Sequence, residues 1–237
     1  MRKWETAWLE YSRTIVTDTT HRNACAALGG SATGVDGVIT DLRWPGYSGQ
    51  HYKPGGLLWV NIVHADLRQK GCEAAASTLI EATRGWRDGE VTDQEYLDAN
   101  RNAYSVGLRR WTVASLIKFI ATQGLGVDIE EMAYVNAARC QVIPGSPQHA
   151  KQDRLVGICQ TWLPISAALK ALRPSLVVTT SASVLRLAPL PDNVLVVGHH
   201  QRRGLGLLAG SPWKPSETDQ RPWREQLAHA WRESQPR

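Results

Sequence analysis

The chain has 237 residues, with 27 Lys and Arg against 22 Asp and Glu, which gives a formal net charge of +5 at pH 7. This length suits one α/β domain with a substantial core, and the basic balance favours an acidic partner such as the DNA backbone. Apolar runs stay short of the roughly 20 residues that a membrane helix needs, and Met-Arg-Lys-Trp-Glu at the start lacks the apolar core of a signal peptide. We therefore expect a cytoplasmic monomer without membrane contact.

The N-terminal region, residues 1–55, is predicted to consist of one helix followed by loops. Residues 1–28 carry Trp4, Trp8, Tyr11 and Ile15 at helical spacing, and a Gly-rich loop follows at 29–37. Residues 41–54 form an irregular aromatic segment. Two interpretations stay open for that segment: a loop with ligand contacts, or a coil that wraps the core.

The first convincing core strand spans residues 56–63, and His64 and Asp66 follow it directly. Residues 71–101 are predicted to be helical, with a break at Asp88-Gly89 and a helix start at Thr92. We interpret the span 67–103 as a helical insertion. Another amphipathic helix is predicted at 109–123.

The second half of the chain alternates strands with helices. Strands are predicted at 132–140, 175–180 and 193–197, and a helix with regularly spaced apolar residues at 155–172. The last part, 211–237, is expected to be an extension with a surface helix at 221–233. This alternation predicts a single domain in which a parallel sheet lies between two helical layers, a three-layer α/β/α sandwich.

The span from Tyr134 to about residue 183 resembles the iron–sulfur-containing branch of the uracil-DNA glycosylases. The resemblance is carried by Asn136 followed by Cys140, a Pro-rich loop at 144–147, Cys159 on a helix, a Leu-rich helix ending at Pro174, and a strand. The family's tyrosine lies three residues before its asparagine, whereas Tyr134 lies two before. The resemblance implies the family's fold and an enzyme that flips a base out of DNA and hydrolyses its N-glycosidic bond.

Asn136 is the predicted base-binding residue. A side-chain amide donates and accepts at once, so it can pair bidentately with the edge of a pyrimidine. In one orientation it reads the N3–H and O4 of uracil, and in the other the N3 and amino group of cytosine. The alternative is an asparagine that caps a loop.

The predicted water-handling residues follow the first core strand. The family has Gly-Glu-x-Pro-Gly in this turn, whereas this chain has Asn61-Ile-Val-His64-Ala-Asp66. Asp66 is a candidate general base, and Asn61 and His64 are rivals for the role. The alternative for Asp66 is a solvated carboxylate that opens the next helix.

The last strand leads to His199 and His200, where the family carries His-Pro-Ser. The resemblance implies that one of the two histidines donates a hydrogen bond to the base oxygen as charge develops on the leaving group. Arg202, Arg203 and Leu205 match the position of the loop that wedges into the duplex. A solvated basic loop is the alternative.

Four cysteines are present: Cys25, Cys72, Cys140 and Cys159. Cys140 and Cys159 match two of the family's four cluster ligands, but its upstream Cys-x-x-Cys pair is missing. The resemblance implies a 4Fe-4S cluster with all four as ligands. The alternative is four buried structural thiols.

The leading hypothesis is a monofunctional DNA glycosylase. Because the first turn and the last motif depart from the family pattern, we expect a reshaped pocket and a bulkier base, such as the hypermodified (for example glucosylated hydroxymethyl) cytosine of phage DNA. That substrate would imply a role in antiviral defence. The alternatives are an ordinary uracil-DNA glycosylase of base excision repair, and a non-catalytic protein that recognises a base in DNA.

Overall fold

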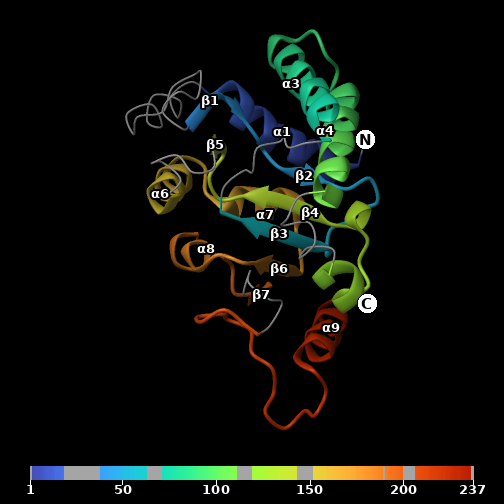
Figure 1. Ribbon diagram of the computed structural model, residues 1–237, viewed down its shortest axis with the longest axis vertical. Coiled ribbons are helices and arrows are strands. Elements are labelled where there is room, and N and C mark those ends of the chain that lie inside the picture. The colour runs from blue at the N-terminus through green and yellow to red at the C-terminus, as the bar shows by residue number, and fades with distance from the viewer. Residues whose placement is uncertain are drawn as a thin grey trace.

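The computed structural model describes residues 2–18, 38–62, 71–110, 119–142, 152–188, 190–199 and 206–235. Its centre is a five-stranded sheet of order β2-β4-β3-β6-β7 (Figure 1). The strands are β2 (Tyr47–Ser48), β3 (Leu57–Asn61), β4 (Ala133–Asn136), β6 (Leu176–Thr179) and β7 (Leu195–Gly198). The last four run parallel, and β2 pairs antiparallel with β4. The predicted α/β class is confirmed.

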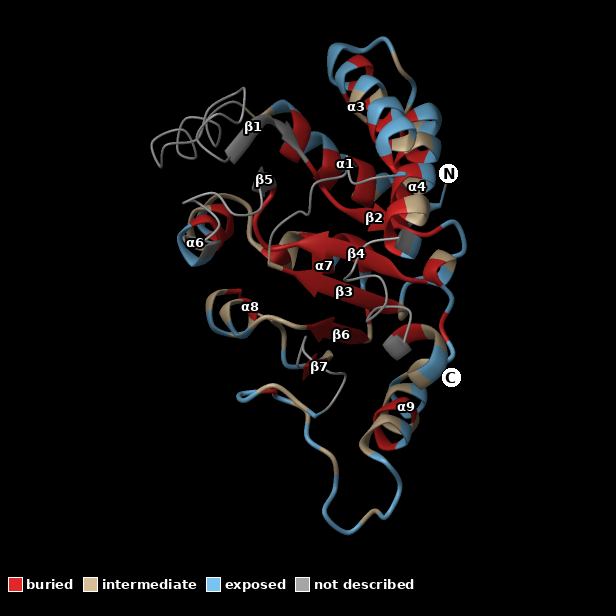
Figure 2. Cartoon of the chain, in the orientation of Figure 1, coloured by how far each residue is buried: buried red, intermediate tan, exposed pale blue. Residues whose placement is uncertain are grey.

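The parallel strands form because their sequences are apolar on both faces. Residues 57–60 of β3 and 176–178 of β6 are fully buried, as strands covered on both sides must be. Figure 2 shows the sheet as the most deeply buried part of the chain, while α3 and α9 expose their outer surfaces.

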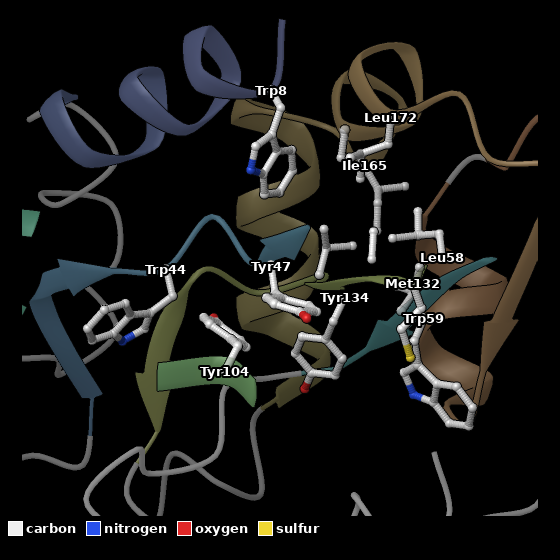
Figure 3. Packing of buried hydrophobic residues seen from close by; sticks show 14 of the residues in the cluster. Trp8, Trp44, Tyr47, Leu58, Trp59, Tyr104, Met132, Tyr134, Ile165 and Leu172 are labelled. Carbon is white, nitrogen blue, oxygen red and sulfur yellow. The ribbon is translucent and has the colours of Figure 1, made fainter. Parts of the chain in front are cut away.

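Helices cover both faces of this sheet. Trp8 of α1 (Lys3–Thr17) and Ile165 of α7 (Ile165–Leu172) lie on one side (Figure 3). Tyr104 of α4 (Asp93–Arg110) lies on the other side with Trp59 and Tyr134. Trp59 and Tyr134 are Cα partners in the parallel register, so they share a face.

The predicted helical break and helix start are both confirmed. Helix α3 (Glu73–Asp88) ends at Gly89, which has a φ of +82° and takes the left-handed conformation that favours glycine. Thr92 then begins α4: the backbone N–H of Thr92 donates to Glu95 Oε2 at 2.8 Å, and the backbone N–H of Glu95 donates to Thr92 Oγ1 at 3.3 Å. This is a capping box.

Helix α4 extends beyond the predicted insertion, to Arg110. It is therefore continuous with the layer that covers the sheet, because Tyr104 packs 5.6 Å from Tyr47 and 5.9 Å from Tyr134 between ring centroids.

The predicted helix at 155–172 is wrong as a single element. The chain instead forms α6 (Gln152–Trp162) and α7, which bend by 61° relative to each other. Pro164 lies between them and acts as the N-cap of α7. Proline has no backbone N–H and clashes with the preceding turn, so it ends the first helix and begins the second.

The predicted strand at 132–140 also divides. Strand β4 ends at Asn136, and Cys140 begins β5 (Cys140–Val142), which pairs antiparallel with β1 (Val38–Arg43) in a separate two-stranded sheet. The sequence predicts neither this sheet nor the antiparallel edge strand β2, because neither segment has an alternating apolar pattern long enough to indicate a strand.

The aromatic segment at 41–54 fits the interpretation of a coil that wraps the core. Trp44, Tyr47 and Tyr52 are all buried, and the Tyr52 hydroxyl donates to the carbonyl of Leu172 at 3.0 Å. Helix α1 buries the predicted Trp4, Trp8, Tyr11 and Ile15 face, and the end of its predicted span lies outside the described residues.

The remaining described elements complete the two ends of the sheet. They are the π-helical η1 (Phe119–Leu125), the 3-10 helix η2 (Ile129–Glu131), α8 (Ala182–Leu187) and α9 (Trp223–Ser234). Segment η1 occupies part of the helix predicted at 109–123, of which 111–118 lie outside the described residues, and α9 confirms the predicted C-terminal helix.

Among the described helices, none is by itself long and apolar enough to span a membrane, and the bent pair of α6 and α7 passes that test by length and composition alone.

Candidate functional site

Polar side chains follow the parallel strands at one edge of the sheet. Strands β4 and β6 flank β3 on opposite sides, so the direction of strand order reverses at β3. In open α/β sheets, ligands bind beyond the carboxyl ends of the strands at such a reversal. The arrowheads in Figure 1 mark that edge on the side where β5, α6 and α8 lie. We therefore place the candidate site there.

Two of the predicted site residues meet at this edge. Asn61 ends β3, Asn136 ends β4, and the two are Cα partners in the parallel register. The Asn61 amide Nδ2 donates to the Tyr134 hydroxyl at 3.1 Å, and that hydroxyl donates to Asn136 Oδ1 at 3.0 Å. All three side chains lie on one face of the sheet and form a continuous hydrogen-bonded string.

The amide nitrogen of Asn136 is the exception in this string. Asn136 is fully buried, and its Nδ2 has no hydrogen-bond partner in the structure as described. A buried donor without a partner costs about 1–3 kcal/mol. At the carboxyl edge of the sheet, this donor is available to a ligand.

Burial keeps the middle of the string protonated. Desolvation raises the pKa of Tyr134 far above its ordinary value, although the hydrogen bonds with Asn61 and Asn136 act in the opposite direction. The phenol therefore keeps its proton at neutral and alkaline pH and remains able to donate to Asn136.

His199 lies at the same edge, directly after β7. Its ring is fully buried and packs against Trp223 of α9 at 5.4 Å between centroids. The His199 backbone N–H donates to the carbonyl of Thr179 at 2.8 Å, which continues the parallel ladder. Strands β4 and β7 lie on opposite sides of β3 in the sheet. Asn136 and His199 therefore lie on opposite sides of Asn61.

The glycine before His199 is closely packed. A Cβ on Gly198 would lie 2.8 Å from Leu185 Cδ1 and 3.1 Å from Leu208 Cβ. The Gly198 backbone N–H donates to Ser211 Oγ at 3.0 Å. Close packing from both sides therefore fixes the backbone that carries His199.

Several predicted site residues lie outside the described residues. They are Cys25, His64, Asp66, His200, Arg202, Arg203 and Leu205. Their predicted roles stay predictions.

The structure describes the side chains of two of the four cysteines, Cys72 and Cys159. Cys159 of α6 is buried, and its sulfur accepts the backbone N–H of Arg139 at 3.3 Å. That contact brings Cys159 next to the segment where Cys140 begins β5. Cys72 is buried at the N-cap of α3. In the described part of the chain, no group of three or more His, Cys, Asp or Glu is arranged to hold a metal, and the side chains of Cys25 and Cys140 lie outside that part.

Sequence reasoning missed the central role of Tyr134, which it had used only as part of the family resemblance. The signal was present: Tyr134 and Asn136 are two residues apart on a strand, so their side chains point to the same face. Arg139, which is fully buried, also has no signal in the sequence that marks it as a site residue.

A pocket of about 670 Å³ lies at the opposite edge of the sheet, lined in part by Gly56, Leu57, Trp231 and Gln235. Gly56 and Leu57 precede or begin β3, so this pocket faces the amino ends of the strands. It contains none of the residues of the hydrogen-bonded string, and we place the candidate site at the carboxyl edge because the strand-end polar residues converge there.

Comparisons with family models, with curated proteins and with solved structures give no match for this chain.

Proposed function

We propose that the protein is a monofunctional DNA glycosylase that flips a modified pyrimidine out of DNA and hydrolyses its N-glycosidic bond. The observation that carries the proposal is Asn136: a fully buried amide at the carboxyl edge of a parallel sheet, with donor hydrogens that have no partner among the described residues. An amide in this state is suited to the edge of an extruded base.

The remaining roles follow from the chemistry of base excision. The bond between C1′ of the sugar and the base nitrogen breaks, water adds to C1′, and the base leaves with negative charge that a hydrogen-bond donor stabilises. His199, at the same edge, is the proposed donor. Asn61 is proposed to position the water, and Asp66 and His64 remain candidates for that step.

DNA is the proposed partner, and the uracil-DNA glycosylase type is the proposed class of α/β fold. Support comes from the resemblance over residues 134–183 and from the parallel strands that place Asn61, Asn136 and His199 on one edge. The departures from the family's first and last motifs favour a bulky modified pyrimidine, such as a hypermodified cytosine of phage DNA, and with it a role in antiviral defence.

A 4Fe-4S cluster is also part of the proposal. Cys140 and Cys159 would supply two of its ligands, and the hydrogen bond from the Arg139 N–H to the Cys159 sulfur supports this pairing because Arg139 precedes Cys140. When bound, such a cluster would hold these segments together. Anaerobically purified protein should then show broad visible absorbance and contain iron, whereas colourless, iron-free protein would leave the cysteines as structural thiols.

One incubation tests the activity. Purified protein is mixed with three DNA substrates, one containing uracil, one unmodified and one carrying phage-type modified cytosine, and alkaline cleavage then reveals abasic sites. We expect cleavage of the modified DNA. Cleavage of uracil DNA alone would identify an ordinary repair enzyme, and binding without cleavage of any substrate would identify a non-catalytic reader.

An Asn136→Ala variant assigns the pocket. It should lose excision while keeping most of its DNA affinity, because phosphate contacts carry affinity and base contacts carry selectivity. Full activity in this variant would show that the base binds elsewhere.

A further inference from the structure

The string Asn61–Tyr134–Asn136 has a direction, and that direction has a chemical consequence. Asn61 donates to Tyr134, and Tyr134 donates to Asn136 Oδ1. A hydroxyl has one hydrogen, so it can donate to only one of its two neighbours. Because Asn61 donates to the Tyr134 oxygen, the hydroxyl hydrogen is directed to Asn136 Oδ1. Asn61 and Tyr134 together therefore set which end of the Asn136 amide the protein holds and which end is left for a ligand.

The two pyrimidine edges differ in the same respect. Uracil presents an acceptor at O4 beside a donor at N3, and cytosine presents a donor at N4 beside an acceptor at N3. An amide in one orientation matches the first pattern, and the amide turned by 180° matches the second. An asparagine that turns freely accepts both bases, and one that is locked accepts one.

We infer that Tyr134 is a positioning residue that selects between uracil-type and cytosine-type bases by locking the amide of Asn136. The inference rests on the proposed function and identifies the part of the protein that sets its substrate class. The lock is built from buried groups: Tyr134 and Asn136 are 1% and 0% exposed, and Asn61 is 8% exposed. Water therefore does not compete for the hydroxyl.

Reversing the lock requires three coordinated changes. The Asn136 amide must turn, the Tyr134 hydroxyl must redirect its hydrogen to Asn61, and Asn61 must offer its oxygen in place of its nitrogen. No single rotation achieves this without leaving a buried donor facing a donor, which costs about the full desolvation of the group.

The test uses pairs of DNA substrates that share the same 5-substituent and differ only as uracil or cytosine. Single-turnover rates give a preference ratio for each variant. Tyr134→Phe removes the hydroxyl and almost no volume, so the ratio should fall towards one, by about tenfold for a single lost hydrogen bond. An unchanged ratio would overturn the inference.

A second variant makes the prediction directional. In Asn61→Asp the carboxylate can only accept, so Tyr134 must donate to residue 61, and its oxygen then accepts Asn136 Nδ2. The amide turns, and the preference should invert. Asn61→Leu offers no acceptor, leaves Tyr134 donating to Asn136, and should keep the original preference even if its absolute rate falls.

Tyr47→Phe is the matched control. Tyr47 is also a fully buried tyrosine on the same face and is the Cα partner of Tyr134, but the acceptors within reach of its hydroxyl are Glu130 Oε2 at 3.0 Å and the carbonyl of Ile129 at 3.2 Å. This variant loses equivalent bonds without touching Asn136, so its preference ratio should match that of the wild type.

A readout without catalysis separates this inference from the proposed function. The side-chain amide protons of Asn136 are unbonded in the native string, and in Asn61→Asp one of them should bond to Tyr134 and shift downfield in the NMR spectrum. If the wild type excises no base, the glycosylase proposal fails. The difference in the Asn136 amide chemical shift between the two proteins still shows whether Tyr134 sets the orientation of that amide. Identical Asn136 amide resonances in the two proteins would overturn the lock regardless of activity.

Discussion

Two buried polar residues with side-chain nitrogens that lack hydrogen-bond partners in the described part of the chain lie at or just after the carboxyl end of β4. Besides Asn136, Arg139 is fully buried, and none of its three guanidinium nitrogens has a hydrogen-bond partner among the described residues. Its guanidinium carbon lies 5.7 Å from the ring centroid of Tyr11, a distance at which a cation is attracted to an aromatic face. Asn136 ends β4 and Arg139 follows it, so both residues lie beside the proposed site.

His199 gives the residue-scale prediction for catalysis. A hydrogen bond from an imidazole to a base oxygen strengthens once the base carries charge, so it acts mainly in the transition state. His199→Ala should therefore slow excision by about 100- to 1,000-fold in single turnover with unchanged DNA binding. His200→Ala should matter far less, because only one of the two histidines is proposed to face the base.

His229→Ala on α9 is the matched control for this experiment, because that histidine is half-buried and pairs with Glu233 at 3.2 Å. Its rate should equal the wild-type rate. Wild-type rates in both strand-end variants would show that the end of β7 is not the catalytic edge.

At the scale of elements, the short strand β2 is held against β4 by a glycine. Gly46 has a φ of +122°, and a Cβ there would lie 2.3 Å from the carbonyl oxygen of Tyr134. Gly46→Ala should therefore destabilise the fold by more than about 2 kcal/mol, because it adds backbone strain to a collision with backbone.

Gly89 has a φ of +82° but open space around it, so Gly89→Ala should cost only about 1–2 kcal/mol. Urea unfolding measures both, and equal costs would contradict the close approach of β2.

The elements that sequence predicted well are those with local signals. Thr92 and Glu95 indicated a helix start by their spacing alone, and the apolar run at 57–60 indicated a buried strand. Pro164 is a local signal for a helix break within 155–172. The prediction of a single helix followed the regular spacing of the apolar residues around it instead.

The linkage of Asn61 to Asn136 had no such signal. It depends on the register of β3 against β4, two strands whose ends are 75 positions apart along the chain, and only the packing of the whole sheet sets that register. Sequence reasoning could therefore name both residues as strand-end candidates but could not show that Tyr134 joins them.

At the scale of the molecule, one carboxylate ties the N-terminus to the helical layer. Glu5 of α1 is 8% exposed and accepts Arg2 at 2.7 Å and Arg101 of α4 at 3.1 Å. The hydrogen bonds from Arg2, together with that from Arg101, lower the pKa of Glu5 from 4.5 to about 2. Since the folded pKa lies below the unfolded one, this contribution is complete above pH 4.5 and is lost as the pH falls towards 2.

Glu5→Gln should therefore reduce the free energy of unfolding at pH 7 by on the order of 2 kcal/mol. The difference from wild type should shrink between pH 4.5 and 2, the window set by the two pKa values. Glu10→Gln, an exposed site on the same helix, is the control and should change little. A difference that stays constant across that pH range would show that Glu5 acts through packing and not through its charge.

The net charge of +5 leads to the last prediction, which concerns DNA binding by the molecule as a whole. Each phosphate that a Lys or Arg neutralises releases counterions, so the logarithm of the affinity should fall linearly with the logarithm of the salt concentration. Replacing Arg202 and Arg203 by Ala should reduce that slope by about 2, or about 1 for each lost phosphate contact.

The control replaces Arg84 and Arg87 of α3, which changes the net charge equally. An equal reduction of the slope there would show that general charge, and not the segment after β7, governs binding. Fluorescence anisotropy with a labelled duplex at a series of salt concentrations separates these outcomes, and an affinity independent of salt would contradict binding through phosphates altogether.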